Sequence, residues 1–196
     1  IPHPKDKNWN GLSLPWMAFG YGVSLTPLQT LNFYNAIANN GEMVKPRFIK
    51  EVKEWDKSIL KVEREVMNPR ICSPETAKKL QNMMQHTVER GTAANIYTPN
   101  FSMAGKTGTC QVEYWIEPGR YISSFAGYFP AENPKYSCIV IIHKPNKRKG
   151  YYGNIVAAPV FKQIAQKIYT DTPVMDTLPS LDIKNDKVVE DFEAYY

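Results

Sequence analysis

The sequence predicts a mixed α/β (α+β) fold in which an antiparallel sheet is flanked by helices. Three observations support this prediction. Two segments with helix-capping signals come first, three strand-like runs joined by short connectors follow, and an amphipathic segment closes the pattern. Of the 196 residues, 43% are apolar and 22% are charged, which provides enough apolar surface for one compact domain.

Two helices are expected in the first half of the chain. Thr26 can cap a helix whose first residue is Pro27, and Asn39-Asn40-Gly41 should end it. Residues 1–24, which precede this helix, lack a helical period and are expected to be an extended lead-in with turns. A second helix should begin at Ser73-Pro74 and end at Arg90-Gly91.

Between the helices, residues 47–52 and 59–66 flank Asp56-Lys57 and predict a hairpin. The three strand-like runs cover residues 102–112, 122–129 and 136–142, with Glu117-Pro118-Gly119 in the first connector. Since the last run contains five successive apolar residues from Cys138 to Ile142, we expect it to be a central strand covered on both faces.

The end of the pattern is a closing helix followed by a tail. Residues 155–169 should form the helix, with an apolar face made of Val160, Ile164, Ala165 and Ile168. Residues 171–196 contain seven acidic residues and two lysines with little periodicity, so we expect an acidic linker or tail after a domain at residues 1–170.

Composition argues against several classes of function. The three cysteines, which are odd in number and have no C-x-x-C spacing, are Cys72, Cys110 and Cys138. His3, His86 and His143 lie far apart, so we expect no metal site. The net charge is +5, but the one basic cluster, from Lys144 to Lys149, is expected to be a solvated turn, and no nucleic-acid partner is expected.

One segment combines the residues of a chemical site: Gly105-Lys106-Thr107-Gly108-Thr109. A phosphate-binding loop would need a glycine at position 100, which is Asn, and a helix after the lysine, where the sequence is strand-like. Gly20 and Gly22 also fail as a dinucleotide fingerprint, because position 25 is Leu. No cofactor is therefore expected.

A Lys-Thr-Gly strand is instead typical of active-site-serine penicillin-recognising enzymes. Four further segments match that family in order and spacing, namely Gly20 to Gln29 with Asn39-Asn40-Gly41 and Pro46, Gly91-Thr92-Ala93, Ser124 to Pro130, and Ala157 to Phe161. From Gly11 to Tyr169 the chain resembles the C-terminal part of the transpeptidase domain of a class B penicillin-binding protein of the cell-division type. The resemblance implies a β-lactamase/transpeptidase-like fold.

The resemblance also implies roles for the strand. A stem peptide, or a β-lactam that mimics D-Ala-D-Ala, would lie along its edge. Lys106 would place a positive charge near the nucleophile and the carboxylate of the substrate, and Thr107 would offer its hydroxyl to that carboxylate. Gly108 would allow close backbone approach, and the Thr109 N–H would be an oxyanion-hole donor, with its side chain also near the carboxylate.

The nucleophile of the family belongs to a Ser-x-x-Lys element far upstream of Lys-Thr-Gly. Ser58-Ile59-Leu60-Lys61 fits the letters, but it lies in a predicted hairpin and too close to Lys106. No Ser-x-Asn occurs in the sequence, and Tyr152-Gly153-Asn154 follows Lys-Thr-Gly instead of preceding it. We therefore expect no nucleophile in this chain, and we expect the chain alone to be inactive.

The family resemblance implies a full enzyme that cross-links peptidoglycan through a serine acyl-enzyme and is inhibited by β-lactams. Its partners would be stem peptides, β-lactams and divisome proteins, and it would act on the periplasmic side of the cytoplasmic membrane, anchored by a segment absent here. Three unpaired thiols are unusual for that compartment. Two alternatives stay open: a fragment of a β-lactam sensor or serine β-lactamase, and a non-catalytic domain that binds cell wall or a division partner.

Overall fold

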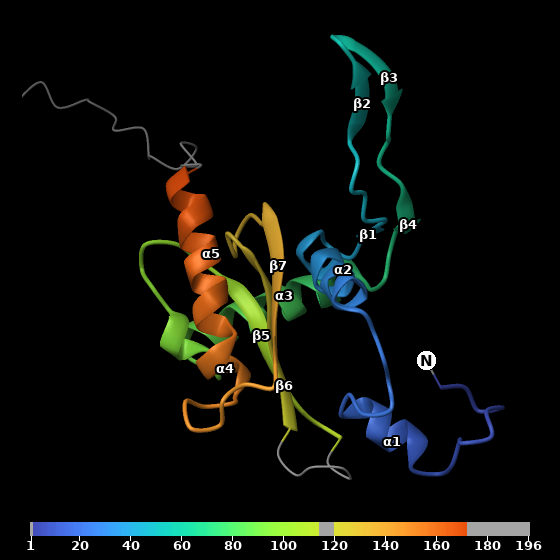
Figure 1. Ribbon diagram of the computed structural model, residues 1–196, viewed down its shortest axis with the longest axis vertical. Helices are drawn as coiled ribbons and strands as arrows, with labels where there is room; N and C mark the ends of the chain where they lie inside the picture. The colour runs from blue at the N-terminus through green and yellow to red at the C-terminus, as the bar shows by residue number, and fades with distance from the viewer. Residues whose placement is uncertain (1, 114–119, 172–196) are drawn as a thin grey trace, which may run out of the picture.

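The computed structural model describes residues 2–113 and 120–171, and it shows a small sheet with helices on both faces and a projecting two-stranded arm (Figure 1). The connector residues 117–119 lie outside the described residues. So does the expected tail, except for Asp171, which ends the last helix, α5 (Ala158–Asp171).

The sheet consists of β5 (Ala104–Val112), β6 (Arg120–Phe129) and β7 (Tyr136–His143), which pair antiparallel in the order β5-β6-β7. This meander confirms the predicted fold class. The central strand is β6, however, and the prediction that the run of residues 136–142 would be central is wrong within the described part of the chain. An apolar run indicates that both faces of a strand are covered, and β7 does contact helices on both faces, α2 and α5. Such a run carries no information about which strands pair with it in the sheet.

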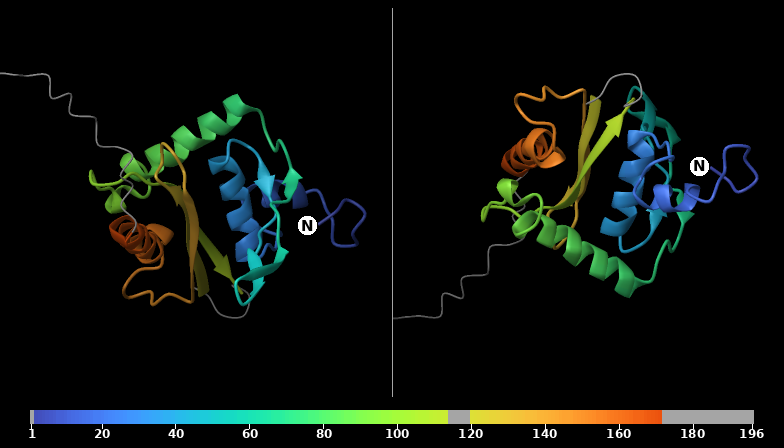
Figure 2. Two further views of the ribbon diagram at one scale, coloured as in Figure 1. Left: turned by 90° about the horizontal axis from the view of Figure 1, so that it is seen from above. Right: turned by 90° about the horizontal axis from the view of Figure 1, so that it is seen from below.

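Helices cover the two faces of the sheet. Helix α5, with the short α4 (Gly153–Val156), packs on one face, and α2 (Pro27–Ala38) packs on the other (Figure 2). Helix α3 (Pro74–Glu89) packs beside β5 and leads through a short 3-10 helix, η1 (Ala94–Ile96), into that strand.

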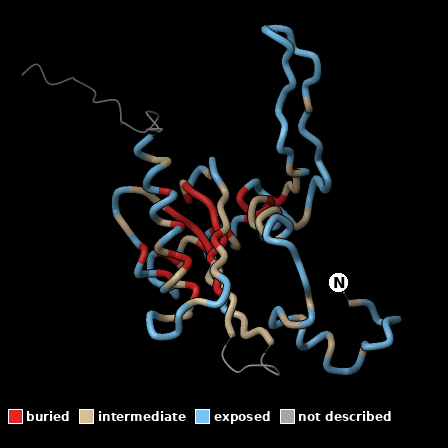
Figure 3. Tube along the Cα trace, viewed as in Figure 1, coloured by how far each residue is buried: buried red, intermediate tan, exposed pale blue. Residues whose placement is uncertain are grey.

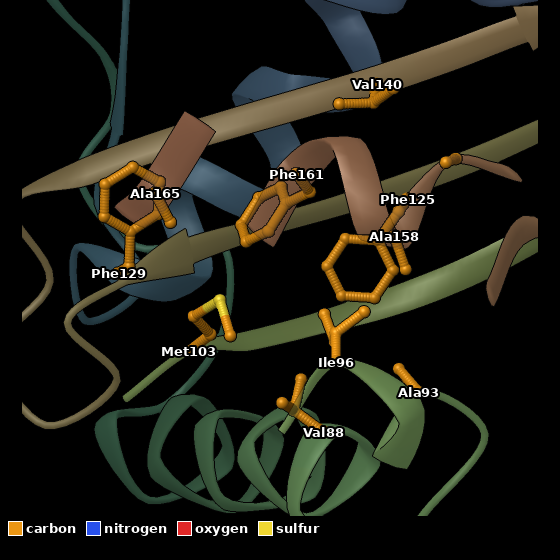
Figure 4. Close-up of a cluster of buried hydrophobic side chains, with 11 residues drawn as sticks. Val88, Ala93, Ile96, Met103, Phe125, Phe129, Val140, Ala158, Phe161 and Ala165 are labelled. Atoms are coloured by element: carbon orange, nitrogen blue, oxygen red, sulfur yellow. The ribbon is translucent and has the colours of Figure 1, made fainter. Parts of the chain in front are cut away.

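The side chains of β6 alternate between the two faces. Phe125 and Phe129 point into a buried cluster with Phe161 of α5 (Figure 4). Tyr128 is buried instead in a second cluster, which includes Ile37 of α2. The two clusters fix the sheet between its covering helices, so the strand that carries Lys106 rests on a rigid support.

The closing helix differs from its prediction in two ways. It is interrupted at Ala157, which separates α4 from α5. The buried face consists of Ala158, Phe161 and Ala165, while the predicted face residues Val160 and Ile164 are 38% and 37% exposed. The prediction is confirmed at Ala165, which is buried, and at Ile168, which packs against the same cluster, and it is wrong at Val160 and Ile164.

Both predicted helix starts are confirmed. Thr26 Oγ1 accepts a hydrogen bond from Gln29 N (3.2 Å), and Gln29 Oε1 accepts one from Thr26 N (2.9 Å), which is a complete capping box. Ser73 Oγ accepts from Thr76 N (3.1 Å) at the start of α3. Gly41, with a φ of +94°, ends the turn after α2 in a left-handed conformation that favours glycine.

The N-terminal segment contains a helix that the sequence did not predict, α1 (Ser13–Ala18). None of its residues is buried, and Trp16 is 48% exposed. A helix of 6 residues is too short for a helical period to reveal.

The predicted hairpin is confirmed, although its strands β2 (Glu51–Glu54) and β3 (Lys57–Lys61) are shorter than expected and turn at Trp55-Asp56. It forms the outer part of the arm, whose base is the pair β1 (Met43–Val44) and β4 (Val66–Asn68). Every residue of β2 and β3 is exposed, and the arm extends away from the sheet (Figure 3).

Candidate active site

The outer edge of β5 carries the Lys106 motif. Across the described residues no strand pairs with this edge, since the sheet order begins at β5. Lys106 is exposed, and its Nζ lies 3.0 Å from the Thr107 carbonyl oxygen and 3.4 Å from Thr107 Oγ1. The contact of Lys106 Nζ with the Thr107 carbonyl oxygen indicates that the N–H and C=O groups of Thr107 point away from β6. Because alternate residues of an antiparallel strand share an edge, those of Thr109 point outward too.

A loop from another part of the chain supports Thr107. The Thr92 Oγ1 lies 3.2 Å from Thr107 Oγ1, so the Gly91-Thr92-Ala93 segment is brought beside the strand as a neighbour of the motif. Gly91 packs against the end of α3, where a Cβ would lie 2.7 Å from Thr87 Cα. The outer edge therefore presents an ammonium group, two threonine hydroxyls and main-chain hydrogen-bonding groups within a short stretch.

The glycines of the motif lie close to side chains of β6. A Cβ on Gly108 would lie 2.5 Å from Ser124 Oγ, and a Cβ on Gly105 would lie 2.5 Å from the Phe125 ring. The expected reason for Gly108 was close approach of a substrate. The structure adds a second reason, which is that Ser124 already occupies the space beside it.

The Thr109 hydroxyl has a partner that sequence reasoning missed. Gly153 N, at the start of α4, donates a hydrogen bond of 3.0 Å to Thr109 Oγ1. The same segment is tied to β6, because Ser123 Oγ donates to the Tyr151 carbonyl oxygen and the Tyr151 ring stacks on Tyr121 with centroids 4.2 Å apart. In sequence, Gly153 stands out only as part of Tyr152-Gly153-Asn154, a poor substitute for Ser-x-Asn, and nothing there indicates a contact with Thr109.

A groove of about 950 Å³ adjoins the motif along β5. Its walls are the last residues of β5 and the N-terminal segment, and aromatic and apolar side chains such as Trp16, Tyr21 and Val112 line it. Cys110, next to Thr109, also lines the groove, and burial raises the pKa of its thiol. The Cys110 thiol therefore stays protonated at neutral pH, which makes it a poor nucleophile.

The other residues singled out in the sequence lie away from this edge. Ser58 pairs with Lys53 in the exposed hairpin of the arm, remote from β5 (Figure 1). The basic cluster lies in a turn, where Lys149 N donates to Asn146 O, as expected. The three cysteines are free, and in the described ranges no group of three His, Cys, Asp or Glu side chains is placed to hold a metal ion. None of the helices described is long and apolar enough to span a membrane.

Comparison with known proteins links this chain to one family. Residues 4–166 match the family described as penicillin binding protein transpeptidase domain. The chain is 32% identical over 180 residues to penicillin-binding protein PbpB of Mycolicibacterium smegmatis, a match that covers 83% of the chain and 26% of that protein. It is 33% identical over 178 residues to the peptidoglycan D,D-transpeptidase FtsI of Buchnera aphidicola, covering 87% of the chain and 28% of that protein.

Solved structures that resemble this chain are also penicillin-binding proteins. Penicillin-binding protein 3 of Mycobacterium tuberculosis in complex with ampicillin superposes with a TM-score of 0.76 and 30% sequence identity, covering 91% of this chain and 42% of that one. The chain thus spans about a quarter of the length of the curated relatives it matches.

Proposed function

Because the chain belongs to the family of penicillin-binding protein transpeptidase domains, we propose that it forms the substrate-binding wall of a serine-type peptidoglycan D,D-transpeptidase. The outer edge of β5 is the observation that carries this proposal. A strand edge that pairs with no other described strand, with an ammonium group at Lys106 and hydroxyls at Thr107 and Thr109, suits an extended peptide that ends in a carboxylate. A β-lactam carboxylate suits the same groups, and the ampicillin complex of a similar structure supports β-lactams as ligands.

In the proposed reaction, a serine Oγ attacks the carbonyl carbon of the penultimate D-Ala of a stem peptide. The serine proton passes to a base, and the Thr109 N–H holds the oxyanion. The C–N bond then breaks and the terminal D-Ala leaves with a proton, which gives an acyl-enzyme ester. An amine of a neighbouring stem peptide attacks this ester, forms the new amide and restores the serine hydroxyl. Lys106 and Thr107 hold the carboxylate of the donor peptide during the first step.

We propose that the serine and its lysine base lie outside residues 1–196. Ser58 has the spacing Ser-x-x-Lys, but it lies on the arm and not at the start of a helix beside β5. The apolar groove adjoins Thr109 through Cys110, and we propose that the serine-bearing segment occupies it. The active protein in this proposal is a longer one in which that segment joins residues 1–196, hereafter the longer transpeptidase.

The remaining parts of the proposal concern the setting of the enzyme. Residues 1–170 belong to the transpeptidase domain, and residues 171–196 form an acidic linker or tail. The enzyme acts in cell division on the periplasmic side of the membrane, where a membrane anchor outside this chain holds it near its divisome partners. The names of similar proteins, PbpB and FtsI, favour a transpeptidase over a β-lactamase, a β-lactam sensor or a non-catalytic binding domain.

Fluorescent penicillin labelling tests this function. We expect the longer transpeptidase to be labelled covalently and the isolated chain of 196 residues to remain unlabelled. Ser58→Ala should leave labelling of the longer transpeptidase unchanged, because Ser58 is exposed on the arm and remote from β5. Label on the isolated chain that Ser58→Ala abolishes would refute the proposed location of the nucleophile. A longer transpeptidase that takes no label would refute the proposed function.

A further inference from the structure

Residues 151–153 contact both β5 and β6 on the face of the sheet that α5 covers. On β6, the fully buried Ser123 donates its hydroxyl hydrogen to the Tyr151 carbonyl oxygen, and the Tyr151 ring stacks on Tyr121. On β5, Gly153 N donates to Thr109 Oγ1 at 3.0 Å. This segment, which we call the clamp, therefore connects the strand edge to the rigid core.

Gly153 is the residue of the clamp that has no room for a side chain. A Cβ there would lie 2.4 Å from the Ser124 carbonyl oxygen and 2.6 Å from the Gly108 carbonyl oxygen. Both distances are far below van der Waals contact, and both atoms belong to the strand ladder, so neither can move without disturbing the β5–β6 pairing. Glycine at position 153 thus sets how closely the clamp approaches Thr109.

The direction of the hydrogen bond has a chemical consequence. A threonine hydroxyl has one donor hydrogen and two acceptor lone pairs. The Gly153 N–H occupies one lone pair of Thr109 Oγ1, and the structure gives the Thr109 hydroxyl hydrogen no acceptor among the described residues. Since Thr109 is exposed at the outer edge of β5, its hydrogen is available to a ligand there.

We infer that Gly153 is a positioning residue, which holds the Thr109 hydroxyl so that its hydrogen points to the carboxylate of a bound acyl donor. This inference rests on the proposed function. It assigns to residues 151–153 a role in carboxylate recognition, with Ser123 and Tyr121 as its anchors on β6.

The hydrogen bond itself is tested in the isolated chain by amide hydrogen exchange. The Gly153 N–H should be protected in the wild type and in Thr109→Ser, which keeps the hydroxyl. In Thr109→Val, which keeps the shape but lacks the acceptor, it should exchange at least about 10-fold faster. Equal exchange in the wild type and Thr109→Val would overturn the inference whether or not the longer transpeptidase is active.

The role in recognition is tested by acylation rates of the longer transpeptidase with benzylpenicillin and with its methyl ester, which has no carboxylate. Thr109→Val should slow acylation by the acid about 10- to 100-fold and change the rate with the ester by less than about 3-fold. Thr109→Ser should restore most of the rate with the acid. Gly153→Ala should slow the reactions with the acid and with the ester, because its Cβ would disturb the β5–β6 pairing that also places the Thr109 N–H.

Gly11→Ala is the matched control, since a Cβ at Gly11 meets no atom within 4 Å. It should not alter either rate. Equal losses with acid and ester in Thr109→Val would indicate a merely structural effect and would overturn the inference, while the wild-type rate would still report on the proposed function. A wild type that neither compound acylates would overturn the proposed function and the recognition role together.

Discussion

Replacing Lys106 by alanine is expected to slow acylation of the longer transpeptidase by benzylpenicillin about 100-fold. The ammonium group lies on the outer edge of β5, where it contacts Thr107 and faces the proposed position of the carboxylate. A hydrogen bond between charged groups contributes about 1.5–3 kcal/mol, and each 1.36 kcal/mol changes a rate tenfold. The quantity to measure is the second-order rate constant for acylation by benzylpenicillin. It is followed by stopped flow in competition with a fluorescent penicillin.

The control for this prediction is Lys57→Ala, which removes the same charge from the exposed arm. It should not change the rate constant. Both variants should melt at the wild-type temperature, because both side chains are exposed. Equal acylation of Lys106→Ala and the wild type would mean that the ligand does not bind along this edge.

Phe161→Ala is expected to destabilise the chain by about 3–5 kcal/mol, the usual cost of truncating a fully buried phenylalanine. Phe161 is 0% exposed, and its ring packs edge-on against Phe125 and Phe129 with centroids 4.8 Å and 5.7 Å away (Figure 4). Since domains are commonly stable by only 5–15 kcal/mol, the variant would lose a large fraction of its stability. Urea denaturation followed by circular dichroism measures the change.

The neighbouring residue provides a matched control. Val160 is 38% exposed, and Val160→Ala should change the free energy of unfolding by less than about 1 kcal/mol. The opposite ranking, with Val160→Ala more damaging than Phe161→Ala, would contradict the packing of Phe161 against β6.

Local signals in the sequence were sufficient for much of the fold. Thr26 and Ser73 mark helix starts because capping depends on residues only three positions apart. The three strands were predicted because β-branched and aromatic runs with short connectors favour hairpins. The Lys106 motif was placed on a strand for the same reason, and the structure puts it on the outer edge of β5.

The errors concern features that depend on distant residues. The lateral position of β7 depends on which strands pair, and an apolar run such as that from Cys138 to Ile142 does not encode this. The buried face of α5 depends on the rings of Phe125 and Phe129 on β6, against which Phe161 packs. The contact between Gly153 and Thr109 joins residues 44 positions apart, so no local pattern could reveal it.

A crystal structure of the longer transpeptidase acylated by benzylpenicillin would show where the nucleophile lies and which edge holds the ligand. We expect an ester on a serine outside residues 1–196, with the ligand along the outer edge of β5. Its carboxylate should lie within about 3 Å of Lys106 Nζ or the hydroxyl of Thr107 or Thr109. An adduct on Ser58, or a ligand bound away from β5, would contradict this expectation.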